Sequence, residues 1–135
     1  MPMRLTAVVA AIQFMIAALV VCADANAQPR RLSIKNDETI EIGTVYYIMQ
    51  CRSIMIGLPE IEMLESPPGV KLSIREEPVL PRAQGCAAKV PGGTLMMTAK
   101  DVKEKVEGTM TYRLKYKTKD GERQTGNSYI VSVFP

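Results

Sequence analysis

Between Gly108 and Thr118 the chain reads GTMTYRLKYKT, in which apolar and polar residues alternate almost without a break. The apolar members of this run stand at every second position: Met110, Tyr112, Leu114 and Tyr116. Successive side chains of a β-strand point to opposite faces, so this run predicts a strand with one buried face. No long segment of the chain keeps the 3.6-residue period of an amphipathic helix.

The same alternation recurs in shorter runs: RLSIK, TIEIG, GVKLSIRE, TLMMTAK and SYIVSVF. A more continuously apolar run, VYYIMQCRSIM from Val45 to Met55, is typical of a central strand that is covered on both faces. Turn-forming sequences such as KNDE, SPPG and VPGG separate the runs, and KDGERQTGN predicts the loop of a hairpin between the last two strands. The segment AKDVKEKVEG fits either a short helical turn or a crossover between strands. These patterns predict an all-β fold, an antiparallel β-sandwich of about seven strands.

Residues 1–27 have the organisation of a secretory signal peptide. Arg4 precedes an apolar run from Ala7 to Val21, and Ala25 and Ala27 provide small residues before a cleavage site ahead of Gln28. We therefore expect one mature domain, residues 28–135, that is periplasmic or secreted and has no membrane span.

Two alternatives to cleavage at this site remain. An uncleaved membrane anchor is one, although the apolar run is short for a span of about 20 residues. A lipoprotein attached through Cys22 is the other, although Val21 is bulky where a small residue normally precedes the lipidated cysteine.

Cys51 and Cys86 are the two cysteines that remain after this cleavage. An even number of cysteines in an oxidising compartment predicts that the two form a disulfide. There is no C-x-x-C pair, which thioredoxin-like chemistry requires, and the chain contains no histidine to complete a zinc site. A pair of free or regulatory thiols is the alternative.

The composition gives little support to catalysis. Without histidine, a serine or cysteine nucleophile lacks its usual base. Glu60, Glu62 and Glu65 fit a carboxylate pair for sugar hydrolysis, but the alternation places Glu60 and Glu62 on the outer face of a strand. The methionines are spread through strands as core residues rather than gathered as copper ligands. We expect no enzyme activity, no cofactor and no metal site; an enzyme that uses carboxylates alone is the alternative.

The segment from Thr94 to Pro135 resembles the closing strands of immunoglobulin-like domains in small exported bacterial proteins. It has a long penultimate strand, a D-G turn and a final V-x-V strand. The resemblance implies an immunoglobulin-like architecture and carries no activity. The chain departs from antibody-type domains because it has no Trp, and Gln84 stands where a Tyr would precede the second cysteine.

The basic residues of the penultimate strand form the candidate partner-binding face. They are Arg113, Lys115 and Lys117, extended by Lys119 and Arg123. The formal net charge of +3 favours neither nucleic acid nor a membrane surface, whereas a local basic face fits an envelope protein or an acidic polymer. A merely solubilising sheet face is the alternative.

The expected function is that of a non-catalytic binding or scaffolding domain of the bacterial cell envelope. A periplasmic enzyme inhibitor, which inserts the exposed loop KDGERQTGN into a target, is the alternative. The physical basis is that such sandwiches hold variable loops on rigid sheets, while the chain lacks the polar groupings that catalysis needs.

Overall fold

The computed structural model describes residues 30–82 and 85–135, and within them the chain forms nine strands and no α-helix. The strands are β1 (Arg30–Lys35), β2 (Thr39–Val45), β3 (Ile48–Met49), β4 (Arg52–Ser53), β5 (Glu60–Glu65), β6 (Val70–Glu76), β7 (Gly93–Ala99), β8 (Val106–Thr118) and β9 (Gly121–Phe134). The predicted signal peptide lies outside the described residues. In the described part of the chain, no helix has the length and apolarity needed to cross a membrane.

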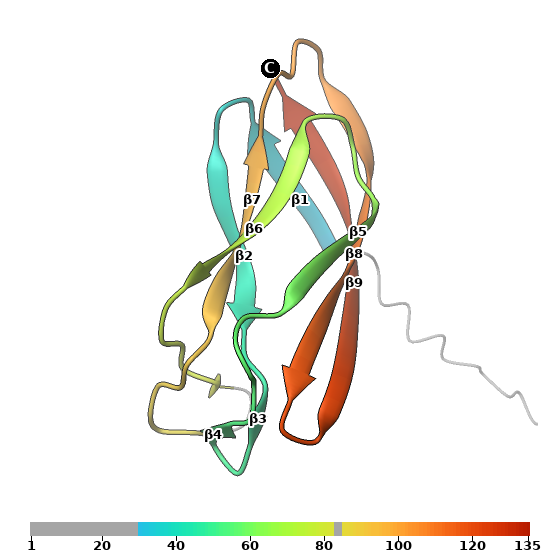
Figure 1. Cartoon of the computed structure of the whole chain (residues 1–135). Coiled ribbons are helices and arrows are strands. Elements are labelled where there is room, and N and C mark those ends of the chain that lie inside the picture. The colour runs from blue at the N-terminus through green and yellow to red at the C-terminus, as the bar shows by residue number, and fades with distance from the viewer. Residues whose placement is uncertain (1–29, 83–84) are drawn as a thin grey trace, which may run out of the picture.

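Two larger sheets face each other across a common core (Figure 1). One has the order β1-β9-β8-β5 and the other the order β2-β7-β6, while β3 and β4 form a small hairpin of their own. The prediction of an all-β fold with antiparallel sheets is confirmed. The predicted number of about seven strands is not: nine are found, two of which are only two residues long. The ladder between β1 and β9 is parallel, which the sequence pattern did not indicate.

The alternating runs supply the core. The four alternating apolar side chains of β8 between Met110 and Tyr116 are at most 5% exposed, and the inward residues of β7 and β9 are at most 6% exposed. These residues are Met110, Tyr112, Leu114, Tyr116, Leu95, Met97, Ala99, Tyr129, Val131 and Val133. The predicted inner faces of these strands are therefore confirmed.

The run from Val45 to Met55 is not the predicted central strand. β2 ends at Val45, and the chain then reverses within the β3–β4 hairpin, where Gln50 and Cys51 have φ angles of 51° and 60°. Two consecutive left-handed residues turn the chain sharply, so this segment cannot continue as one extended strand. Its side chains are accordingly less buried than predicted, and Met49 is 54% exposed.

The predicted loop KDGERQTGN is also mostly strand. Only Lys119 and Asp120 form the turn, and the pairing of β8 with β9 runs without a register shift from Val106 opposite Val133 to Thr118 opposite Gly121. β8 provides hydrogen-bond partners along this whole length, so the polar composition of the segment does not end the strand. The ambiguous segment AKDVKEKVEG is a crossover that leads into β8.

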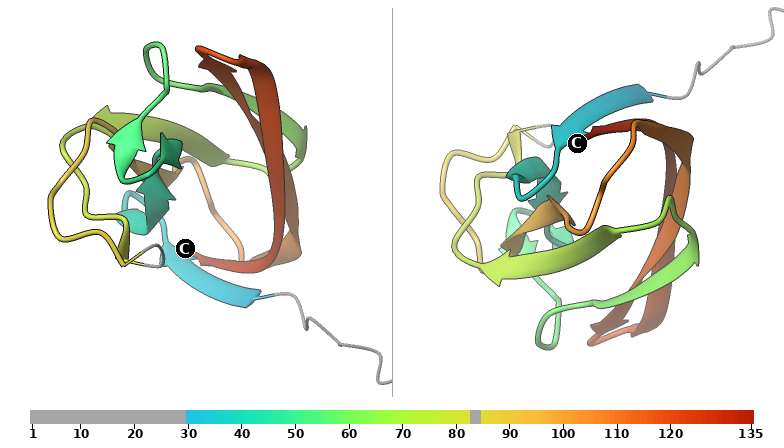
Figure 2. Two further views of the ribbon diagram at one scale, coloured as in Figure 1. Left: turned by 90° about the horizontal axis from the view of Figure 1, so that it is seen from below. Right: turned by 90° about the horizontal axis from the view of Figure 1, so that it is seen from above.

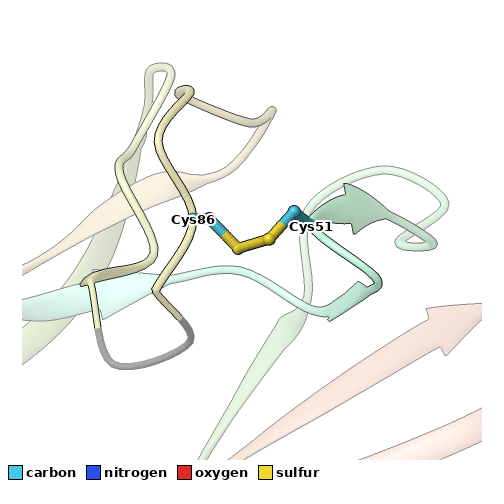
Figure 3. The surroundings of a disulfide bond; sticks show 2 residues. All are labelled: Cys51 and Cys86. Atoms are coloured by element: carbon cyan, nitrogen blue, oxygen red, sulfur yellow. A yellow bond between two sulfur atoms is a disulfide. The ribbon is translucent and has the colours of Figure 1, made fainter.

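The predicted disulfide between Cys51 and Cys86 is confirmed. It links the tip of the β3–β4 hairpin to the long connection between β6 and β7 (Figure 3). The two cysteines are separated by 35 positions, so the bond closes a large loop at the end of the molecule that is farthest from the C-terminus (Figure 1). By this link the hairpin is held to the three-stranded sheet.

Candidate functional site

The first half of β9 has a neighbouring strand on one side only. β1 pairs with the last residues of β9, from Arg30 beside Tyr129 to Lys35 beside Phe134. Over Gly121–Ser128, no strand of the described part of the chain pairs with β9 on the side away from β8, and these eight residues are all exposed. The final hairpin thus extends beyond β1 (Figure 1), and the views along the molecule show β1 lying at the C-terminal end of the chain (Figure 2).

The peptide groups on this open side can be identified from one hydrogen bond. The backbone N–H of Asn36 donates to the carbonyl oxygen of Phe134 over 2.7 Å, on the side of β9 that faces β1. The hydrogen-bonding side alternates along a strand, and the β8–β9 ladder has no register shift. The backbone N–H and C=O groups of Glu122, Gln124 and Gly126 therefore point outward from the open side.

This open side lacks two common protections of an exposed strand edge. The edges at β2 and β5 are interrupted by bulges, between Glu41 and Gly43 and between Met63 and Glu65. Gly121–Ser128 contains neither a bulge nor a proline. A regular, proline-free edge of this length is a template for another strand.

One side chain occupies a hydrogen-bonding group of the edge. The guanidinium Nη1 of Arg123 donates to the carbonyl oxygen of Glu122 over 3.0 Å. This carbonyl belongs to the outward peptide groups, so Arg123 occupies an acceptor that an added strand would use. Its pairing partner in the ladder is Tyr116, which places the side chain of Arg123 on the inner face of the sheet.

A hollow of about 440 Å³ lies beside the open edge. Its lining comes from the end of β2 and the following residues on one side, and from β9 on the other: Thr44, Tyr46, Tyr47, Ile48 and Thr125. We call the strand edge Gly121–Ser128 together with this hollow the β9 edge site.

Two buried phenols support the inner side of this site. Asn127 Nδ2 donates to the hydroxyl of Tyr112 over 3.5 Å. Burial raises the pKa of Tyr112 to about 12, although the hydrogen bond from Asn127 lowers it. Burial also raises the pKa of Tyr116, although Thr125 lowers it. Both phenols are therefore neutral hydrogen-bonding groups at physiological pH.

The predicted basic face is a surface of mixed charge. Arg113, Lys115 and Lys117 are exposed on the outer face of β8, as predicted. Lys115 Nζ lies 2.9 Å from Glu62 Oε2, and this contact lowers the pKa of Glu62 and raises that of Lys115.

Acidic residues flank all three of these basic side chains. The register places Glu62 beside Arg113, Glu60 beside Lys115 and Glu122 beside Lys117. Directly opposed residues share a face of the sheet, so the carboxylates partly neutralise the basic row.

Lys119 and Arg123 were expected to extend this face, but they lie elsewhere. Lys119 lies in the turn between β8 and β9, and Arg123 belongs to the inner side of β9. The β9 edge site was not predicted, because the local sequence carries no signal for what lies beside a strand.

The described residues contain no group of three or more His, Cys, Asp or Glu side chains placed to hold a metal ion. Both cysteines of this part of the chain are joined in the disulfide. No family model, no curated protein and no solved structure matches the chain.

Proposed function

We propose that the protein is a non-catalytic exported binding module of the bacterial cell envelope, which receives an extended polypeptide segment as an added strand along β9. The observation that carries this proposal is the regular, open edge Gly121–Ser128 beside the hollow. In strand addition, main-chain hydrogen bonds supply affinity, and pockets for alternate side chains supply specificity. The β9 edge site offers both elements.

The architecture that we propose is an immunoglobulin-like sandwich. With β3 and β4 set aside, the orders β2-β7-β6 and β9-β8-β5 correspond to the two sheets of such domains. β1 pairs with β9, unlike the first strand of constant-type antibody domains, which joins the other sheet. The disulfide also differs from that of antibody-type domains, because it links a hairpin tip to a connection instead of joining the two sheets.

The disulfide also supports export of the protein. Disulfides persist in oxidising compartments such as the periplasm and the extracellular space, and they are rare in the cytosol. Together with the predicted signal peptide, the bond between Cys51 and Cys86 supports a periplasmic or secreted location.

A polypeptide segment fits the surface better than the partners expected from sequence. An acidic polymer would meet Glu60, Glu62 and Glu122 among the basic residues of β8. An inhibitor loop would have to act through the two-residue turn at Lys119 and Asp120, because the rest of the expected loop is strand.

Photo-crosslinking at the edge tests this proposal. A photoreactive phenylalanine derivative replaces Gln124 in the exported protein, and cells are irradiated before the adducts are identified by mass spectrometry. Thr98, on the outer face of the central strand β7 in the other sheet, carries the same probe as a control. We expect a discrete protein adduct from position 124 that is absent from position 98.

A second substitution shows whether the contact uses the backbone. The N–H of Gly126 points outward, so Gly126→Pro removes a donor of the open edge without removing a hydrogen bond to β8. Gly126→Ala is the matched control, because an added Cβ would meet only ordinary contacts at 3.5 Å or more. We expect the adduct to disappear with proline and to remain with alanine. An adduct that survives Gly126→Pro would exclude strand addition.

A further inference from the structure

We infer that the β9 edge site selects an extended segment of another protein in which an acidic residue and an aromatic or large apolar residue stand two positions apart. This inference rests on the proposed function, since it names the side chains that an added strand would carry. Thr125 and Arg123 define the two positions.

The alternation of β9 determines which side chains of an added strand enter the site. Arg123, Thr125 and Asn127 all lie opposite inward residues of β8, so they share the inner face of the sheet. Residues of an added strand directly beside them point to the same face, and their Cβ atoms lie about 4.5–5.5 Å away. The residue beside Thr125 is therefore directed at the hollow, and the residue two positions along lies beside Arg123.

The hollow fits an aromatic or large apolar side chain. Its lining includes the half-buried Tyr46, Tyr47 and Ile48, and it has a volume of about 440 Å³. Aromatic rings pack favourably against one another in tilted or offset arrangements. The ring of Tyr47 is already held in such an arrangement with Tyr116, so this wall of the hollow is ordered before a partner arrives.

Arg123 makes the edge selective for a carboxylate. An added strand needs the carbonyl oxygen of Glu122, which the guanidinium of Arg123 now occupies. A carboxylate beside Arg123 offers a stronger, charge-assisted hydrogen bond, so the guanidinium can release the carbonyl without losing its own partner. A segment without the carboxylate must break the hydrogen bond between Arg123 and the Glu122 carbonyl without replacing it. This unfavourable free energy discriminates against such segments.

The occupant is another protein and not a segment of the same chain. β1 lies beside Tyr129–Phe134, and if its register continued backwards, residues before Gln28 would be needed to cover Gly121–Gly126. The predicted signal-peptide cleavage removes these residues. A second copy of the edge is also a poor occupant, because its sequence GERQTGNS has no aromatic or large apolar residue for the hollow.

Synthetic peptides test the inference with the mature protein, residues 28–135. Fluorescein-labelled peptides of about nine residues, within ordinary strand length, carry Glu-x-Tyr or Tyr-x-Glu in a Ser/Thr background. Matched peptides replace the Glu by Gln or the Tyr by Ser, and binding is followed by fluorescence anisotropy. We expect one Glu/Tyr peptide to bind about two- to fivefold more tightly than its Gln counterpart, the upper part of the range for an exposed charge pair. The order that binds reports the orientation of the added strand.

Two protein variants identify the residue responsible. In Arg123→Gln, the Glu and Gln peptides should bind equally, and the Gln peptide should bind more tightly than it does to the native protein, because the carbonyl of Glu122 is no longer guarded. Lys117→Gln removes a charge of the same sign from the outer face and should leave the preference for Glu unchanged. Gly126→Pro should abolish binding of every peptide.

The outcomes separate this inference from the proposed function. Equal binding of Glu and Gln peptides to the native protein, or no binding of any peptide, would overturn the inferred selectivity. The proposed function would still stand if the crosslinked adduct from position 124 disappeared with Gly126→Pro. A dimer in sedimentation experiments that dissociates in Gly126→Pro would identify a second copy as the occupant and would also overturn the inference.

Discussion

The rings of Tyr47 and Tyr116 lie 5.2 Å apart between centroids and are inclined at 53° to each other. Tyr116 belongs to β8, whereas Tyr47 lies just before β3, so this contact joins the small hairpin to the four-stranded sheet. On its other side the hairpin is tied to the connection between β6 and β7 by the disulfide. The wall of the hollow is therefore held from both sheets.

Tyr47→Ala should destabilise the fold and weaken peptide binding together. Loss of the ring removes a half-buried aromatic contact, for which we expect a decrease of about 2 kcal/mol in the free energy of unfolding. Tyr47→Phe keeps the ring and should behave like the native protein in urea denaturation and in peptide binding. If Tyr47→Ala bound peptides normally, the hollow would not be part of the site.

Removal of the disulfide should destabilise the protein more strongly. A closed loop of 35 positions corresponds to about 3–4 kcal/mol in the chain-entropy model. The double variant Cys51→Ser, Cys86→Ser should show this loss in urea denaturation, and reductant should produce the same loss in the native protein. Reductant should have no effect on the double variant. An unchanged thermal midpoint in reductant would contradict a stabilising role for the bond.

Charge reversal on the outer face of β8 should leave the fold intact. Arg113, Lys115 and Lys117 are exposed, so the triple change to Glu should give soluble protein with a native circular dichroism spectrum. The single change Lys115→Glu places two carboxylates beside each other and should lower the thermal midpoint slightly. The added change Glu62→Lys should restore it, since the pair is then reversed in sign. Failure to fold of the corresponding triple change to Gln, which adds no negative charge, would mean that this face is buried.

Alkaline pH should destabilise the protein through its buried phenols. The folded-state pKa of Tyr112, about 12, lies above its ordinary value, and that of Tyr116 is raised in the same direction. Below about pH 10 the phenol is protonated in both the folded and the unfolded state, so this group adds no pH dependence. Between about pH 10 and pH 12 the unfolded state releases the proton of Tyr112 first, and stability should fall by about 1.4 kcal/mol per pH unit from this group, with a further decrease from Tyr116.

Tyr112→Phe isolates the contribution of one phenol. The slope of unfolding free energy against pH should be shallower in this variant than in the native protein over the same range. An identical slope in both proteins would show that folding does not raise the pKa of Tyr112.

Gly92→Ala should be strongly destabilising. A Cβ at this position would collide with the carbonyl oxygen of Val45 and would lie 2.8 Å from Cγ2 of Val79. The backbone of the β6–β7 connection would have to move away from β2, at a cost of about 1–3 kcal/mol. Gly43→Ala is the matched control, because no atom lies within 4 Å of its added Cβ. Equal thermal midpoints for the two variants would contradict this close approach.

Much of the fold followed from local patterns. The alternation of β8 predicted its inner residues Met110 to Tyr116 and its outer residues Arg113 to Lys117, because the direction of a side chain depends only on its position along the strand. The two cysteines expected to remain after signal-peptide cleavage predicted the disulfide for a similar reason: the prediction requires no knowledge of the topology.

The candidate site could not be predicted in this way. The basic residues of β8 were found by pattern, but their acidic neighbours Glu60, Glu62 and Glu122 come from two other strands. Arg123 was assigned to the same face because the hairpin turn was expected to be longer. Once β9 begins at Gly121, the register places Arg123 on the inner face.

The sequence by itself determined the strands with regular alternation, their apolar faces and the pairing of Cys51 with Cys86. Only the tertiary structure decided that VYYIMQCRSIM bends into a hairpin beside the core, and that β1 covers only the last part of β9. The physical reason is that side-chain direction is a local property of a strand, whereas an edge is open or closed according to which distant segment lies beside it. The six residues of β1 reach from Tyr129 to Phe134, and within the described residues this limit leaves Gly121–Ser128 without a second neighbouring strand.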